Sequence, residues 1–326
     1  MSVVVFTLGG TIAMSARDGT VTRLTGADLV AAIPSLSTVG TSVDVRDVVA
    51  VPSADLTFAS VLDLVAAAER AIADGAIGVV VTQGTDTLEE TAFLVDLVWP
   101  HSEPFVITGA MRNPTLAGPD GPANVLAAVR VAASGAARGH GALVVFADDV
   151  HAARWVRKTH STSIGTFASP DAGPIGHVIE ETVRILATPL DRPPAVTLTE
   201  LRGAQTARVA LYALALDDDG ALLGHIPDAY QGLVVAAFGV GHVPSWIAPV
   251  LGDLADRMPV VLTSRTGAGS VLGGTYHAIG SETDLARRGL INGGLLHPWK
   301  ARVLLTVLLT AGRSRAEIAD TFALYA

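Results

Sequence analysis

Hydroxyl and carboxylate side chains are concentrated between a buried strand predicted at 77–81 and a helix predicted at 88–98. The connecting segment reads Thr-Gln-Gly-Thr-Asp-Thr and contains Gly84, Thr85 and Asp86. A glycine permits a sharp turn and a close backbone approach to a ligand. Ligands of open parallel α/β sheets bind at the carboxyl ends of the strands. The segment therefore offers a hydroxyl, a carboxylate and free N–H groups to a small molecule. The alternative interpretation is that these residues only form a well-capped start of the following helix.

A second glycine turn follows the strand predicted at 3–7 and exposes Thr11. The turn, Leu-Gly-Gly-Thr-Ile-Ala, matches neither common glycine-rich phosphate-binding pattern, so we do not favour a phosphate site. The polar segment 14–25 contains Asp18-Gly19, which is a turn signal. It predicts a mobile loop beside Thr11 that can serve as a lid.

Lysine is rare in this chain, which contains only Lys158 and Lys300. Lys158 lies in the weakly periodic segment 150–169, among threonine and serine residues. One interpretation is a solvated surface charge. The other is a desolvated lysine that acts as a base, which a threonine hydroxyl needs before it becomes a good nucleophile.

Two further polar residues, Ser53 and Asp55, follow a strand predicted at 43–51 and precede a helix predicted at 58–73. Both are residue types that cap helix N-termini. We favour the capping role for Asp55.

The elements that must position these residues alternate between strand and helix through about residue 150, which predicts a doubly wound, mainly parallel sheet. Further segments of this N-terminal part are a strand at 104–108, a helix at 123–133 and a strand at 142–146. Proline-rich residues 189–206 are typical of a linker. The predicted organisation is an N-terminal α/β catalytic domain at 1–188 and a smaller C-terminal α/β domain at 207–326. The C-terminal domain is expected to have strands near 209–213, 232–236 and 259–263, and helices near 245–256, 298–310 and 315–322.

The composition restricts the class of protein. The chain has 326 residues, is 50% hydrophobic and carries a net charge of -9, which is typical of a compact enzyme and disfavours nucleic acid as a partner. It has no cysteine, so disulfides, zinc–thiolate sites and a thiol nucleophile are excluded. The first residues do not resemble a signal peptide, and no long apolar run predicts a membrane span. We therefore expect a cytoplasmic protein without metal or membrane association.

Three motifs of the N-terminal part, G-G-T-I-A at 9–13, Q-G-T-D-T-L-E-E-T-A at 83–92 and G-A-M-R at 109–112, resemble the bacterial L-asparaginase family. The pattern W-V-R-K-T-H-S-T at 155–162 is similar to the lysine segment of that family, and G-V-G-H-V-P and H-P-W-K-A-R-V-L-L also match. This resemblance covers nearly the whole chain. It implies a cofactor-free homotetramer of intimate dimers that hydrolyses L-asparagine to L-aspartate and ammonia.

The resemblance also implies roles for individual residues. Thr11 is similar to the nucleophilic threonine, and the remaining catalytic cluster corresponds to Thr85, Asp86 and Lys158. The substrate ligands correspond to Ser53, Gly84, Asp86, to Ala110 through its backbone, and to Glu282, which would reach a neighbouring subunit's site. A carboxylate suits the α-ammonium of an amino acid, and backbone N–H groups suit a tetrahedral intermediate.

The chain departs from the family pattern at three places. Ala54 replaces a Gln or Glu that contacts the substrate's α-groups, no tyrosine lies in 14–25, and His242 stands where many members have Asn. Ala54 leaves room for a side-branch amidase that acts on glutamine, a D-amino acid or another amide. A non-catalytic amino-acid-binding protein is the alternative from a different class, although a binder has no need for two threonines and a lysine around an amide.

Overall fold

The computed structural model describes residues 2–9, 14–17, 20–23, 28, 31–188 and 196–325. The chain divides into two compact units, Met1–Leu198 and Thr199–Ala326, and each is described by itself. Residues 189–195 of the predicted linker lie outside the described residues. A short helix, α5 (Leu198–Leu201), follows them, and the predicted limits at 188 and 207 stay predictions.

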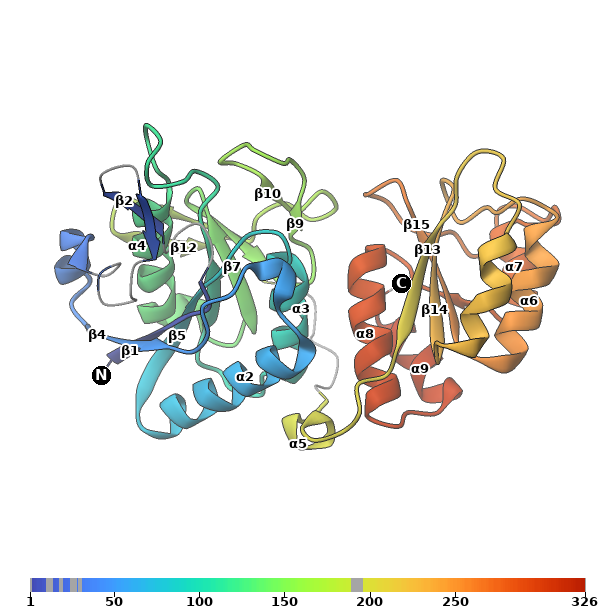
Figure 1. Ribbon diagram of the computed structural model, residues 1–326, viewed down its shortest axis with the longest axis horizontal. Helices are drawn as coiled ribbons and strands as arrows, with labels where there is room; N and C mark the ends of the chain where they lie inside the picture. The colour runs from blue at the N-terminus through green and yellow to red at the C-terminus, as the bar shows by residue number, and fades with distance from the viewer. Residues whose placement is uncertain are drawn as a thin grey trace. The chain divides into compact units, whose positions relative to one another are not determined.

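The first unit is built on parallel strands, as predicted (Figure 1). These strands are β1 (Ser2–Thr7), β4 (Ser42–Asp47), β5 (Ala76–Thr82), β6 (Phe105–Thr108) and β7 (Ala142–Phe146). Their spatial order is β7-β6-β5-β1-β4. Each is rich in buried Val, Ile or Phe, with the edge strand β4 more exposed, as expected for strands covered on both faces.

The same sheet is extended beyond β7 by antiparallel strands, which makes it mixed rather than wholly parallel. These strands are β8 (Asp149–Ala152), β11 (Gly176–Ile179) and β12 (Thr182–Ile185). A tight turn joins β7 to β8, and such a turn can connect only antiparallel neighbours. The predicted fold class, a larger N-terminal mainly parallel α/β unit and a smaller C-terminal α/β unit, is confirmed.

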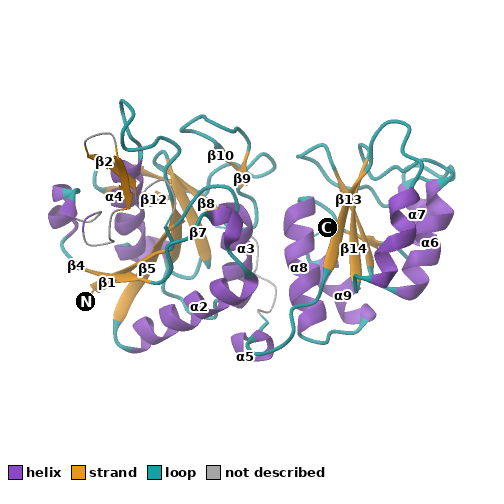
Figure 2. Ribbon diagram, in the orientation of Figure 1, coloured by secondary structure: helices purple, strands orange, loops and turns teal. Residues whose placement is uncertain are grey.

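Helices cover both faces of this sheet (Figure 2). They are α2 (Phe58–Ala73), α3 (Leu88–Val98) and α4 (Gly121–Ala133), with short 3-10 segments η2 (Pro34–Val39), η3 (Ser53–Asp55) and η4 (Gly135–Ala137). On one face, α4 packs Val125 and Val129 against Val3, Val80 and Leu143 of the strands. On the other, α2 and α3 contact each other and the sheet.

Two of the sequence predictions about local structure are wrong. Segment 14–25 is not only a loop, because β2 (Met14–Arg17) and β3 (Thr20–Arg23) pair antiparallel within it; Asp18 and Gly19 lie outside the described residues. Asp55 does not cap α2 either. The N-cap is Thr57, whose side chain exchanges capping-box hydrogen bonds with Ser60, because the 3-10 turn η3 ends before the helix begins.

The second unit has its own parallel sheet, in the order β13-β14-β15-β16. The strands are β13 (Val209–Ala213), β14 (Gly232–Ala237), β15 (Val260–Ser264) and β16 (Ile291–Asn292). The helical segments are η5 (Ala221–Asp228), α6 (Ile247–Arg257), α7 (Glu282–Arg287), α8 (Pro298–Thr310) and α9 (Arg315–Ala323). Leu251 and Leu254 of α6 pack against Leu233, Val235 and Leu262 of the sheet.

Neither a membrane span nor a metal cluster is found in the described part of the chain. No helix there is both long enough and apolar enough to cross a bilayer. No three His, Asp or Glu side chains in the same residues are grouped to hold a metal ion.

Candidate active site

The switch point of the first sheet lies between β1 and β5. The chain leaves β1 for β4 on one side and leaves β5 for β6 on the other, and such a divergence opens a crevice at the carboxyl ends of the two strands. Leu8, just after β1, donates its N–H to the carbonyl of Thr82 at the end of β5, at 2.9 Å. The turns that follow these two strands therefore start side by side.

The turn after β1 begins at Gly9, whose φ of 89° lies in the region that favours glycine. A Cβ there would also come within 2.9 Å of the Val51 carbonyl oxygen. This agrees with the tight glycine turn expected from the sequence. Thr11 itself lies outside the described residues.

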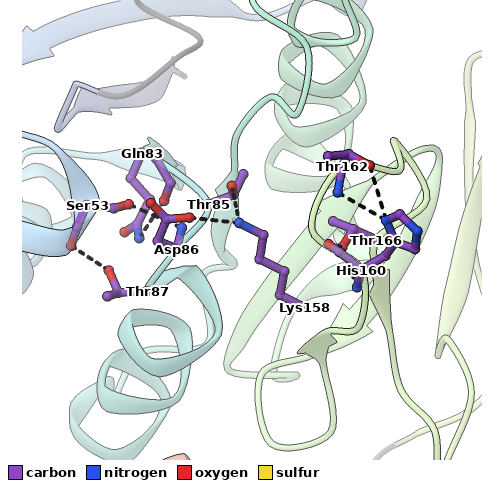
Figure 3. Close-up of polar contacts among 10 residues, drawn as sticks. Ser53, Gln83, Thr85, Asp86, Thr87, Lys158, His160, Thr162 and Thr166 are labelled. Carbon is purple, nitrogen blue, oxygen red and sulfur yellow. Dashed lines mark hydrogen bonds and ion pairs between the residues drawn. The ribbon is translucent and has the colours of Figure 1, made fainter.

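The turn after β5 is locked to Ser53 of η3 (Figure 3). The Ser53 hydroxyl accepts the N–H of Asp86 at 3.2 Å, and the Ser53 carbonyl accepts the Thr87 hydroxyl at 2.8 Å. A Cβ on Gly84 would lie 2.7 Å from the Ser53 hydroxyl oxygen, so only glycine permits this approach. Ser53 is buried, and its hydroxyl bonds the turn after β5. It does not cap α2, whose N-cap is Thr57.

Lys158 joins this turn from a distant part of the chain. It ends β9 (Arg157–Lys158), which pairs antiparallel with β10 (Phe167–Ala168). Its Nζ donates to Thr85 Oγ1 at 2.9 Å and to Asp86 Oδ1 at 2.8 Å. The Lys158 side chain is only 18% exposed whereas that of Asp86 is 69% exposed. Lys158 is therefore not a solvated surface charge, and the Asp86 carboxylate still faces solvent.

A third turn, after β6, lies against the second. A Cβ on Gly109 would meet the Gln83 carbonyl oxygen at 2.6 Å and Thr85 Cγ2 at 3.3 Å. Ala110 follows directly and is buried. The turns that carry Thr85 and Ala110 are therefore adjacent.

Two residues at the start of α4 hold the Ala110 turn in shape. The carboxylate of Asp120 accepts the N–H groups of Met111 and Arg112, at 3.0 and 2.9 Å. The buried Asn124 donates to the Gly109 carbonyl at 3.0 Å and to Asp120 at 3.2 Å. Neither residue was predicted from the sequence; Asp and Asn four residues apart at a helix start, after a Pro- and Gly-rich stretch, were the available signal.

Glu282 lies in the second unit, at the start of α7. Its carboxylate accepts the N–H groups of Thr275 at 2.8 Å and Tyr276 at 2.7 Å, and lies 3.3 Å from His242 Nε2. Burial by itself would raise the pKa of the Glu282 carboxyl, but the hydrogen bonds from Tyr276, Thr275 and His242 outweigh it and lower that pKa. Glu282 is thus a buried carboxylate rather than the ordinary surface residue of the alternative interpretation.

The structure brings together most of the predicted site within the first unit: Ser53, Gly84, Thr85, Asp86, Ala110 and Lys158. It presents a hydroxyl bonded to a lysine amine, a solvent-facing carboxylate and a rigid glycine turn. Such an arrangement can move a proton between a hydroxyl and an amine while it binds an ammonium group. The fold and this cluster define a two-unit α/β protein with a threonine–lysine–aspartate site at the carboxyl edge of its first sheet.

Comparisons with known proteins agree with that class. The family model described as "Asparaginase, N-terminal" matches residues 2–191, and the model "Glutaminase/Asparaginase C-terminal domain" matches residues 208–322. The chain belongs to the asparaginase family.

Individual relatives cover nearly the whole chain. A "Probable L-asparaginase" of Deinococcus radiodurans is 38% identical over 295 residues, which cover 89% of this chain and 88% of that protein. "L-asparaginase 2" of Escherichia coli is 34% identical over 336 residues, covering 99% and 93%. A crystal structure of a probable cytoplasmic L-asparaginase from Campylobacter jejuni superimposes with a TM-score of 0.88 at 29% identity and covers 99% of both chains.

Proposed function

We propose that this protein is an L-asparaginase, which hydrolyses L-asparagine to L-aspartate and ammonia. The observation that carries the proposal is the Lys158 amine, which bridges the Thr85 hydroxyl and the Asp86 carboxylate at 2.9 and 2.8 Å. Membership of the asparaginase family over both units supports the same reaction class. The substrate is a small amino-acid amide.

Thr11 is the nucleophile in this proposal. Its hydroxyl oxygen attacks the side-chain amide carbon, ammonia leaves with a proton from the enzyme, and water hydrolyses the resulting ester. The Thr85–Lys158 pair moves the protons: Thr85 passes the proton of the Thr11 hydroxyl on to the Lys158 amine. Asp86 stabilises the ammonium that forms and keeps it in place, because opposite charges at this distance attract.

The α-groups of the substrate are bound by the turn after β5. The Asp86 carboxylate, 69% exposed on its side chain, binds the α-ammonium with the oxygen that does not face Lys158. Ser53 and the backbone at Gly84 bind the α-carboxylate, and the backbone at Ala110 contacts the amide. No metal or other cofactor has a role.

The proposal is tested by measuring ammonia release from L-asparagine, L-glutamine, D-asparagine and a peptide-embedded asparagine. We expect the highest kcat/KM for L-asparagine. A clear preference for another amide would instead make the protein a side-branch amidase, and Ala54 is exposed on η3 where such a substrate would have room. Binding of asparagine without ammonia release would identify a non-catalytic binder.

We also propose a cytoplasmic homotetramer built from dimers, in which the Glu282–His242 pair completes a neighbouring subunit's site. The buried Glu282 holds the His242 ring at 3.3 Å, and the His242 side chain, 38% exposed, is the outer member of the pair. Sedimentation velocity at the assay concentration tests this. A fully active monomer would contradict it.

A further inference from the structure

The hairpin that carries Lys158 has little strand pairing of its own. Strands β9 and β10 are two residues each, with Lys158 opposite Phe167 and Arg157 opposite Ala168. A short isolated hairpin is marginal in water. Packing of the buried Phe167 on Phe146 anchors one side of the hairpin, and the eight-residue connection 159–166 adds hydrogen bonds that order the backbone directly after Lys158.

The base of that connection is tied by Thr159, His160 and Thr166. Thr159 donates its N–H and its hydroxyl to the Thr166 carbonyl, at 2.8 and 2.9 Å. His160 donates its N–H to the Thr166 hydroxyl at 3.0 Å, and the same hydroxyl donates back to the His160 carbonyl. These bonds continue the pairing of β9 and β10 by two residues beyond Lys158.

The tip of the connection is organised by the His160 ring (Figure 3). Its Nδ1 lies 3.0 Å from the N–H of Thr162 and 3.0 Å from the N–H of Ser163. Because both partners are backbone donors, Nδ1 must accept, and the ring carries its proton on Nε2. The imidazole thus does what an Asn or Asp side chain does when it bonds the backbone two residues on.

From this geometry, and resting on the proposed function, we propose that His160 is a positioning residue for Lys158. The residue closes the hairpin at its base through its backbone and at its tip through Nδ1. It never touches Thr85 or Asp86 in the described contacts. Its effect on the reaction passes through the backbone of β9, which sets where the Lys158 amine lies.

The consequence for catalysis follows from how Lys158 is held. Its long side chain spans from β9 to the turn after β5, and its amine must meet two partners at 2.9 and 2.8 Å. A misplacement of about 1 Å in such a group can cost about a hundredfold in rate. Loss of order at 159–166 therefore lowers kcat and leaves the substrate ligands on other turns unchanged.

The experiment compares His160→Ala, His160→Asn and a control, His225→Ala, an exposed histidine in the second unit. We expect His160→Ala to lower kcat for asparagine by about tenfold to a hundredfold, with KM within about twofold of the wild type. His160→Asn should recover most of kcat, because its side-chain oxygen can accept a backbone N–H two residues on. His225→Ala should match the wild type.

Hydrogen exchange of the segment 158–168, followed by mass spectrometry, gives a readout independent of activity. The N–H groups of Thr162 and Ser163 should exchange faster in His160→Ala and regain protection in His160→Asn. Wild-type kcat in His160→Ala, an effect on KM alone, or equal damage in both variants would overturn the positioning role. Absence of ammonia release from the wild-type protein would refute the proposed function, while the exchange data would still decide whether His160 orders the hairpin.

Discussion

Replacement of Lys158 should lower kcat strongly and change the free energy of unfolding only slightly. Lys158→Met removes the amine that bonds Thr85 and Asp86 and keeps most of the side-chain volume. General acid–base catalysis by a positioned group contributes about 10² to 10⁴ in rate, or about 2.7–5.4 kcal/mol of transition-state stabilisation. We therefore expect kcat to fall by about two to four orders of magnitude.

The effect on folding should be much smaller because of where the charges lie. The Asp86 side chain is 69% exposed, so water solvates its carboxylate once the lysine is gone. Ion pairs with so exposed a member contribute about 0–1 kcal/mol. The free energy of unfolding should accordingly change by no more than about 1 kcal/mol.

The assay measures ammonia release and urea unfolding on the same preparations, with Lys158→Arg as a matched variant. Arginine keeps the charge beside Asp86 but does not deprotonate in proteins, so it should preserve stability and still be inactive. Substantial activity in Lys158→Arg would mean that the amine acts through its charge. A large loss of stability with activity retained in Lys158→Met would refute both the proton-transfer role of Lys158 and the small contribution of its ion pair to stability.

Three further outcomes are expected. Thr11→Ala should abolish turnover while the circular dichroism spectrum stays that of the folded protein; substantial residual amidase activity would remove Thr11 from the nucleophile role. Ala54→Gln should lower KM for asparagine by about tenfold, since a hydrogen bond to a charged group is worth about 1.5–3 kcal/mol, and raise glutamine turnover relative to asparagine; unchanged or worse constants would show that residue 54 is not a substrate contact. The pKa of Glu282 is lower in the folded protein than in the unfolded chain. The ionised Glu282 carboxylate therefore stabilises the fold fully above its ordinary pKa of about 4.3, and this stabilisation is lost as the pH falls through the lower pKa of the folded protein. The urea midpoint should therefore fall more steeply between pH 5 and pH 3, about the range of carboxyl titration, in the wild type than in Glu282→Gln, and parallel curves would contradict this.

The sequence by itself determined the regular elements whose signals are local. The helices predicted at 58–73, 88–98 and 298–310 have these same bounds in the structure. The apolar strands that follow or precede them were also found, because continuous β-branched runs between turn residues are typical of buried strands. Alternation of the two element types then indicated the parallel sheet, and the glycine turns at its carboxyl edge indicated where the site lies.

Elements stabilised by distant partners were not predicted. The antiparallel strands β8, β11 and β12 and the two-residue pair β9–β10 are too short to carry a periodic signal. The helix α7 was missed for the same reason, and with it the burial of Glu282, whose hydrogen bonds come from a preceding loop.

Only the tertiary structure decided how the site is assembled. Lys158 meets Thr85 across 73 residues of chain, and Ser53 meets Asp86 across 33. No local propensity encodes such a contact, because it exists only once the sheet has brought separate turns to one edge. The same holds for His160, whose ring could have been solvated but accepts two backbone N–H groups. The sequence thus determined which residues are available for the chemistry, and long-range packing decided which of them touch.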